Sequence, residues 1–587
     1  MPFYFARAGY LLKESKNFIL KKYGEALHEV IVLVPNVYAA NQLAKLFVSK
    51  DLSAALLPKI IPIEEIKIVG NKIVTLDKGE LANYFEHQLI IAKIISSSKH
   101  YNFNIRQSLD LSKSILILLH EFMKSGREPI DLSKLNYEHF LQLQTLGEFL
   151  QEIKDKWLLE LSRHFIGDVL DVCLKNCNQL SDLVQQGRFL PKLVLIDVTQ
   201  VSFWRLIRNL HSSAFDMIFA TFEKDGVAKQ KWIKSGLIKL LEHCGSKVEE
   251  MTHLWPNINS IQEEKATDVS YQVFPNEIKE LNFIANLLLS KTHLEPSLDI
   301  SVILDDLEMV HTLVQILYGY NIEVKNLVGL SLTRNVAVQF LLLIAKLQKQ
   351  DASVKDLISL LKHPYFERNI SENFEHLAIS QGLIFQSLVG AKLRLKEQDC
   401  RVYQIYSNAL FLDKADSSFR GCLKAHFEAA QLLFPLIWQS TEYVAVCEYI
   451  QNLFSAARHL EFISKESYWD ILTKLLHGKY YADSPLNSKI CIVSPRDVSF
   501  LNAQLVIVPN FHDESWPSLG DSDVWLSDNI RSELGLSDVR SDQLENYRDY
   551  FFSVISFPKA LFTRSSKSLG KDTIESRFWS QHFINNF

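Results

Sequence analysis

The sequence predicts an α/β protein with two parallel-sheet domains, each interrupted by an all-helical insert. Short apolar, β-branched runs stopped by proline or asparagine are typical of strands buried on both faces of a parallel sheet. Two long stretches between such runs show only the three- and four-residue spacing of helices. Because strands resume after each helical stretch, we expect strands of one sheet to lie more than about 100 residues apart.

The first domain is predicted to comprise residues 1–80 and 186–268, with the helical insert at 81–185. Helical spacing runs from Phe5 to a glycine stop at Gly24 and resumes over Val37–Ser49. Strands are expected at Glu29–Asn36, Leu57–Ile63, Pro191–Val198 and Phe215–Phe222. Residues 245–270 are polar without periodicity, and we interpret them as a linker or a loop.

The second domain is predicted to comprise residues 269–366 and 486–587, with the helical insert at 367–485. Strands are expected near Val269, at Asp299–Asp306, at Lys489–Pro495, at Leu505–Val508 and within Lys559–Trp579. Polar residues gather around Trp516, after the strand that ends at Val508. Ligands of open α/β sheets bind at the carboxyl ends of strands. We therefore expect the functional edge of the protein there.

Length and composition indicate a multidomain intracellular protein. The 587 residues exceed what one hydrophobic core usually holds. With 63 basic and 68 acidic residues, the net charge is −5, so nucleic-acid contact would need local basic patches or a partner. The seven cysteines form no paired framework, and neither an apolar leader nor an 18-residue apolar run occurs. These features favour a reducing, cytoplasmic compartment without membrane contact.

A phosphate-binding loop of the form GxxxxGK[ST] is absent from the sequence. Gly478-Lys479 precedes tyrosine, Gly570-Lys571 precedes aspartate, and Gly9, next to the first helix, has no Gly-Lys pair beside it. Such a loop supplies the backbone amides and the lysine that hold nucleotide phosphates. We therefore expect no nucleotide cofactor.

Other sites of known chemistry have weak signals. Asp197 and Asp305-Asp306 follow apolar strands, where carboxylates can bind Mg²⁺, although single acids at strand ends are common. Cys173 and Cys177 lie four residues apart downstream of His164, but a structural zinc site needs a further ligand pair. No nucleophile elbow such as GxSxG is present. The expectation is no catalytic residue and no metal.

Two basic patches favour an anionic partner. Residues 7–22 carry a net charge of +4, and residues 559–577 hold five basic and two acidic side chains. Arg564, Lys567, Lys571 and Arg577 follow a predicted strand among serine, threonine and glycine, a mixture that phosphate contacts use. Solvated helix and strand faces produce similar charge runs. Residues 505–549, with ten acids and three bases, would repel a phosphate backbone.

Taken in order, several segments resemble AddB, the accessory subunit of bacterial AddAB helicase–nucleases, particularly its alphaproteobacterial form. The segment EVIVLVPNVYAANQL, from Glu29, is similar to a family strand and helix reading roughly vLvPTrrAArxL. Leu360–Pro364 matches a Leu-Leu-Lys-His-Pro motif, and AQLVIVPNFHDESWP, from Ala503, resembles aDlVvLgGLNEGxWP. LFTRSSKSLGKDTIESRFW, from Leu561, resembles LTRaxxxxGxPxxpSRwL. The resemblance extends from about Val30 to Trp579.

The sequence departs from this family at two places. Asn510–Ser515 replaces the glycines of the family's Gly-Leu-Asn-Glu-Gly turn. Family members continue into a nuclease domain with a metal site and, in many, an iron–sulfur cluster, whereas this chain ends at Phe587. We interpret it as a short form or as one part of a split gene whose nuclease domain is a separate chain.

The resemblance implies two helicase-like, RecA-like domains and a non-catalytic scaffold that guides single-stranded or duplex-end DNA in double-strand break repair. An AddA-type helicase–nuclease subunit is the implied partner. By position, Arg564, Lys567 and Arg577 would contact DNA phosphates, and Trp516 would stack on a base or pack in the core. Two alternatives remain open: an ATP-dependent helicase in its own right, and a degraded remnant of a nuclease gene.

Overall fold

A computed structural model gives the architecture of the chain. It describes residues 3–48, 57–70, 72–135, 140–187, 192–199, 201–203, 206–207, 215–223, 231–243, 268–391, 396, 399–413, 415–482, 488–520, 523–568 and 570–584. The predicted linker or loop at 245–270 therefore lies almost wholly outside the described residues. No helix in these ranges is long and apolar enough to cross a membrane.

The first sheet confirms the predicted pairing of strands across a helical insert. Its parallel strands lie in the order β1 (Phe3–Arg7), β7 (Asp216–Glu223), β6 (Lys192–Ile196), β2 (Val30–Val34) and β3 (Lys59–Pro62), with β8 (Lys231–Ile233) antiparallel to β7. Helices α1 (Leu11–Tyr23), α2 (Val37–Phe47) and α8 (Ser235–His243) connect or follow these strands. A hairpin, β4 (Ile66–Val69) and β5 (Lys72–Thr75), stands apart from the sheet.

The second sheet has six parallel strands. Their order is β11 (Lys325–Asn326), β14 (Ile490–Val493), β10 (Ile300–Ile303), β15 (Leu505–Val508), β16 (Lys559–Ser565) and β9 (Asp268–Phe274). All four residues of β15 are buried, as its apolar run predicts. Flanking helices are α10 (Glu277–Leu294), α11 (Leu307–Gly319), α21 (Asp528–Glu533), α22 (Val539–Ile555) and α23 (Arg577–Trp579).

Helices fill the two stretches that interrupt the sheets. The first contains α3 (Tyr84–Ser96), α4 (Ile105–Ser125), α5 (Phe140–Arg163) and α6 (Val169–Gln185). The second contains α12 (Val336–Lys346), α13 (Val354–Leu361), α14 (Arg368–Ser380), α16 (Cys400–Ala409), α17 (Phe419–Leu433), α18 (Thr441–Val444), α19 (Cys447–Ala456) and α20 (Tyr468–Leu476). Two short antiparallel strands, β12 (Leu330–Ser331) and β13 (Tyr480–Tyr481), pair where this second helical stretch begins and ends.

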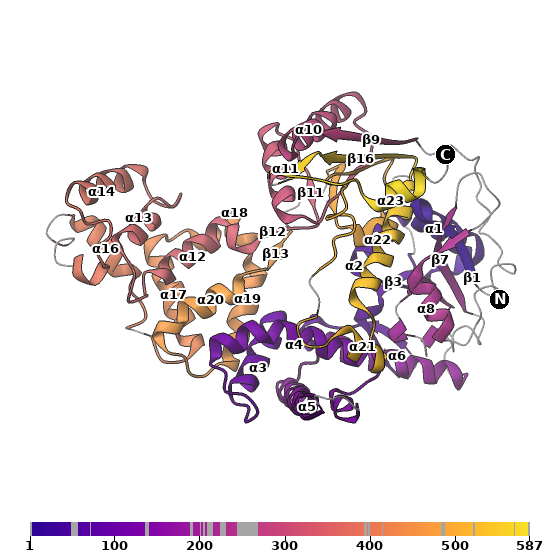
Figure 1. Cartoon of the computed structure of the whole chain (residues 1–587), viewed down its shortest axis with the longest axis horizontal. Coiled ribbons are helices and arrows are strands. Elements are labelled where there is room, and N and C mark those ends of the chain that lie inside the picture. Colours follow the sequence, from indigo (N-terminus) through magenta and orange to yellow (C-terminus); the bar gives the residue numbers. More distant parts are fainter. Residues whose placement is uncertain are drawn as a thin grey trace.

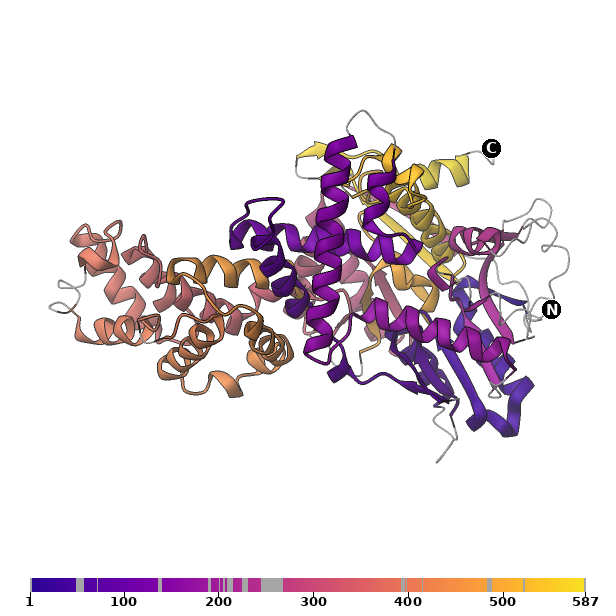
Figure 2. The same cartoon turned by 90° about the horizontal axis from the view of Figure 1, so that it is seen from below.

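The hydrophobic cores group some helices with other elements than their order in the chain suggests. Helix α6 packs on the first sheet, because Cys173 and Leu180 share a core with Leu195. Helices α12 and α13 share the core of the later helices, since Phe340 and Leu360 cluster with Phe419. We call α3–α5 the first helical region and α12–α20 the second helical region. In Figures 1 and 2 the second helical region projects to one side of the two sheets.

The two sheet domains pack directly against each other. Phe500, which follows β14, lies in the core of the first domain with Val32. Asp549 on α22 accepts hydrogen bonds from the backbone amide (2.9 Å) and hydroxyl (2.8 Å) of Ser235. The helical regions also meet, because Leu89 of α3 lies in the core of the second helical region. The four parts therefore form one connected body (Figure 1).

Candidate nucleic-acid interface

The carboxyl edge of the second sheet is the edge at which the sequence places a ligand. Helix α10 begins after β9, and Asn276 caps it by accepting a hydrogen bond from the Lys279 amide at 2.9 Å. The first turn of this helix carries Glu280 to the ends of β15 and β16. The chain leaves β15 through Asn510, whose backbone has a positive φ of 56°.

Glu280 is the central acid of this edge and is fully buried, with 0% of its surface exposed. Its Oε1 accepts hydrogen bonds from the Asn510 amide at 2.8 Å and from the Thr563 hydroxyl at 2.6 Å. Burial raises the pKa of Glu280, and the two hydrogen bonds oppose that shift. Through these two hydrogen bonds, the Glu280 carboxyl group connects the turn that follows β15 with strand β16.

Arg564 on β16 reaches the same edge and is half-buried. Its Nη1 donates to the carbonyl and the hydroxyl of Thr573 at 2.8 and 3.2 Å. Tyr271 of β9 lies beside it, and burial raises the pKa of the tyrosine hydroxyl to about 12, against the effect of the Arg564 charge. The guanidinium is thus anchored on one side.

Several buried polar atoms at this edge have no hydrogen-bond partner among the described residues. They are the Tyr271 hydroxyl, Glu280 Oε2, Asn510 Oδ1, Arg564 Nε and the Ser565 hydroxyl. Buried polar atoms in native proteins are usually paired with protein groups or with ordered water. Donors and acceptors are mixed among these atoms, a combination that ordered water can satisfy.

The other two predicted phosphate contacts lie on the segment that follows β16. Lys567 is exposed on β17 (Lys567–Ser568), which pairs with β18 (Lys571–Asp572). Arg577 is exposed but forms a two-pronged ion pair with Asp513, at 2.7 and 2.8 Å. That pair lowers the pKa of Asp513 and neutralises part of the basic patch. The structure therefore places all three cations around one edge. Of the three, Arg577 forms an ion pair with an acid, whereas Arg564 donates to Thr573.

Trp516 does not lie on this surface. It is only 1% exposed, and its ring packs against Phe511 and Tyr547 with centroids 5.7 and 5.4 Å away. A nucleobase therefore has no access to its faces, and of the two expected roles the position of Trp516 fits core packing. The apolar run before it and the aromatic residues of α22 create this core.

The strand-end acids and the cysteine pair have structural partners. Asp305 accepts a hydrogen bond from the Tyr547 hydroxyl at 2.7 Å, and Asp197 forms an ion pair with Lys234. Cys173 and Cys177 are buried in the core of the first sheet, with their sulfur atoms 4.0 Å apart. His164 belongs to a different cluster, described below.

The connection after β1 is the first strand-to-helix connection of the first sheet. Here it is a single 3₁₀ turn, Ala8–Tyr10, packed against the end of α22. A Cβ atom on Gly9 would lie 2.7 Å from the carbonyl oxygen of Ser556. The second sheet domain therefore covers this connection.

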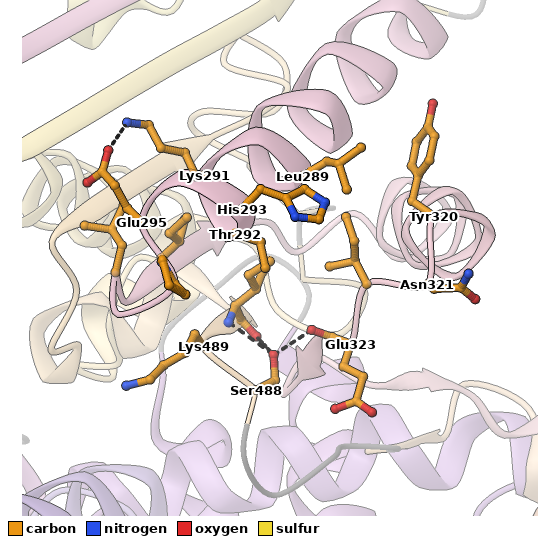
Figure 3. Close-up of a pocket in the computed structure, with 15 residues that line it drawn as sticks. Leu289, Lys291, Thr292, His293, Glu295, Tyr320, Asn321, Glu323, Ser488 and Lys489 are labelled. Carbon is orange, nitrogen blue, oxygen red and sulfur yellow. Dashed lines mark hydrogen bonds and ion pairs between the residues drawn. The ribbon is translucent and has the colours of Figure 1, made fainter.

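A cavity of about 400 Å³ lies at the opposite, amino edge of the second sheet (Figure 3). Its wall includes Lys291, which pairs with Glu295 at 2.6 Å, and the Ser488 hydroxyl, which donates to the Glu323 carbonyl at 2.6 Å. These polar groups are satisfied by the protein itself. The cavity shares no residue with the carboxyl edge.

Sequence reasoning missed Glu280 and Tyr271. A signal existed for Glu280, because it falls on the buried stripe of α10 formed by Leu281, Ile284 and Leu288. A charged residue on the apolar face of a helix is rarely buried without a specific partner. Tyr271 had no such signal, since aromatic residues are common in strands.

Comparisons with known proteins give distant relatives. No family model matches the chain. A Rickettsia felis protein, named only as uncharacterized, is 22% identical over 572 residues, covering 97% of this chain and 59% of that relative. A Rickettsia typhi protein, also named as uncharacterized, is 21% identical over 575 residues, covering 95% of this chain and 58% of the relative. The chain thus spans less than two thirds of the length of these curated relatives.

Proposed function

We propose that the chain is a non-catalytic, DNA-binding scaffold similar to AddB, with two helicase-like, RecA-like domains. In this proposal it guides single-stranded DNA within an AddAB-type complex that repairs double-strand breaks, beside an AddA-type motor subunit. The architecture carries the proposal. Two parallel sheets, each interrupted by helices, belong to domains that pack against each other, which is what a two-domain motor fold would require.

The covered connection after β1 supports a role without nucleotide turnover. A phosphate-binding loop exposes several backbone amides toward its ligand. At Gly9, an added Cβ atom would instead lie 2.7 to 3.2 Å from backbone atoms of Ser556 and Phe557, which belong to the other sheet domain. The same surface cannot hold both this contact and a nucleotide phosphate.

The cations at the carboxyl edge support the DNA part of the proposal. Lys567 and Arg577 are exposed, and Arg564 is held beside unpartnered polar atoms. Lysine and arginine contacts to phosphates release counterions, so binding through them weakens steeply as salt rises. Base stacking must come from aromatic residues other than Trp516, which is buried.

Charge reversal of Arg564, Lys567 and Arg577 to glutamate is expected to weaken single-stranded DNA binding at least about tenfold and to flatten its salt dependence. Fluorescence anisotropy of a labelled oligonucleotide, titrated at several KCl concentrations, measures both quantities. The matched control reverses Lys355, Arg368 and Arg401, exposed cations of the second helical region, and changes the net charge equally. Equal losses in both triple variants, or none in either, would contradict the assignment of this edge.

A further inference from the structure

Two histidines and one glutamate meet where the two helical regions touch. Glu160 and His164 lie four residues apart on α5, so they share one helix face. His459 ends the 3₁₀ turn Ala457–His459 of the second helical region. One donor atom from each of the three side chains lies within 4.8 Å of the other two.

The geometry of the cluster is close. His164 Nε2 lies 3.6 Å from Glu160 Oε1, and the rings of His164 and His459 are 4.6 Å apart and nearly perpendicular. His459 is 2% exposed, while Glu160 and His164 are half-buried and open toward solvent on one side. An ion could therefore enter from solvent and be held by a buried ligand.

Neighbouring residues hold His459 in place. Glu86 of α3 is buried and accepts a hydrogen bond from Arg458 at 2.8 Å. Its Oε1 also lies 3.8 Å from His459 Nε2. Glu86 and Arg458 therefore hold the Nε2 side of the His459 ring in place.

The positive charges near the cluster are already paired. Glu160 Oε2 accepts a hydrogen bond from Arg163 at 3.1 Å, while Glu160 Oε1 faces His164. Arg458 is paired with Glu86, and its Nε donates to His459 Nε2 at 3.3 Å. Lys93 also lies near Glu160 and pairs with Glu461 at 3.8 Å. The carboxylates Glu86, Glu160 and Glu461 thus balance the three cations, so the cluster is not strongly cationic.

From these contacts we infer that Glu160, His164 and His459 bind a divalent transition-metal ion of the Zn²⁺ class. Two imidazole nitrogens and one carboxylate oxygen are a common three-ligand set for Zn²⁺, with water as the fourth ligand. Bonds of about 2.0–2.1 Å place such ligand atoms about 3.3 Å apart, so small side-chain rotations close the observed spacing. The ion would link α5 of the first helical region to the second. This inference does not depend on DNA binding.

The site is tested by zinc stoichiometry of the full-length chain. After equilibration with Zn²⁺ and removal of free metal, wild type is expected to retain one equivalent by mass spectrometry of the metal. His164→Ala and His459→Ala are expected to retain none, and Glu160→Gln should weaken affinity by about tenfold or more. The matched control, His376→Ala, alters an exposed histidine of α14 and should retain the ion.

Co²⁺ absorption and thermal stability give independent readouts. Wild type loaded with Co²⁺ is expected to show the visible bands of a four-coordinate site, and these bands should disappear in His164→Ala. Zn²⁺ should raise the melting temperature of wild type and His376→Ala, because an ion bound only to the folded state stabilises it. Since His164 is half-buried, its alanine variant keeps the core even if His459→Ala does not fold. Equal zinc content in wild type and His164→Ala would overturn the inference.

Discussion

Replacing Arg531 by methionine is expected to destabilise the protein by about 3–5 kcal/mol, the cost of removing one partner from a buried ion pair. Arg531 is 1% exposed, and its guanidinium donates to Glu121 at 2.6 Å, to Asp523 at 2.5 Å and to the Ser537 carbonyl at 3.0 Å. Without it, the half-buried carboxylates of Glu121 and Asp523 would lose the cation that they share. The loss should appear as a lower midpoint in urea unfolding.

This arginine joins parts of the chain that are far apart in sequence. Glu121 lies on α4 of the first helical region, whereas Arg531 lies on α21 of the second sheet domain. The core beneath them contains Leu526 and Leu534 together with Phe122. Methionine would keep the apolar contacts of the arginine side chain. The loss of stability therefore measures the contribution of the guanidinium group that joins Glu121 and Asp523.

Two controls sharpen the Arg531 result. Arg540→Met removes an exposed arginine from α22 and is expected to change stability by less than about 0.5 kcal/mol. Arg531→Lys keeps the charge but cannot contact both acids in a planar fork, so its loss should be intermediate. A methionine variant as stable as wild type would show that the ion pair is not structural.

Replacing Trp516 by alanine is expected to cost about 3–5 kcal/mol, because a large ring leaves a cavity in a close-packed core. Trp516 packs with Phe511, Phe551 and Tyr547 at the junction of β15 and α22. The milder Trp516→Phe keeps most of the apolar volume and should fold. Its affinity for single-stranded DNA, measured below its melting temperature, is expected to match wild type.

Trp516→Phe also separates core packing from base stacking. A stacking role would lower DNA affinity in the folded phenylalanine variant without much loss of stability. Core packing lowers the melting temperature and leaves DNA affinity unchanged. A variant with wild-type stability and clearly weakened DNA binding would contradict the burial of this residue.

The sheet strands could be predicted well from the sequence. Leu505–Val508 and Val30–Val34 are short β-branched runs with clear stops, and both are central strands of their sheets. The first strand, Phe3–Arg7, was missed because its residues merge with the helical spacing that follows. Its pairing with β7, more than 200 residues away, forms hydrogen bonds that no local pattern encodes.

Helical periodicity identified helices but not their packing partners. Helix α6 was grouped with the first insert, yet its apolar face covers the first sheet. Helices α12 and α13 were grouped with the second domain, yet they share the core of the second helical region. A helix shows in its sequence that one face is buried, but the element covering that face depends on the tertiary structure.

The candidate site shows the same limit. The sequence shows where cations concentrate after β16, but not that Arg577 is paired with Asp513, 64 residues away. It shows an aromatic residue after β15, but not that the residue is buried under α22. Charge and aromatic patterns give the chemistry of an edge, whereas long-range contacts decide which groups remain available.

Hydrolysis of ATP by the purified full-length chain, measured with saturating single-stranded DNA, tests the central claim most directly. The account predicts DNA binding without hydrolysis above the protein-free background, because Ser556 and Phe557 cover the connection at Gly9. DNA-stimulated turnover of ATP would contradict it and would favour a helicase that acts on its own.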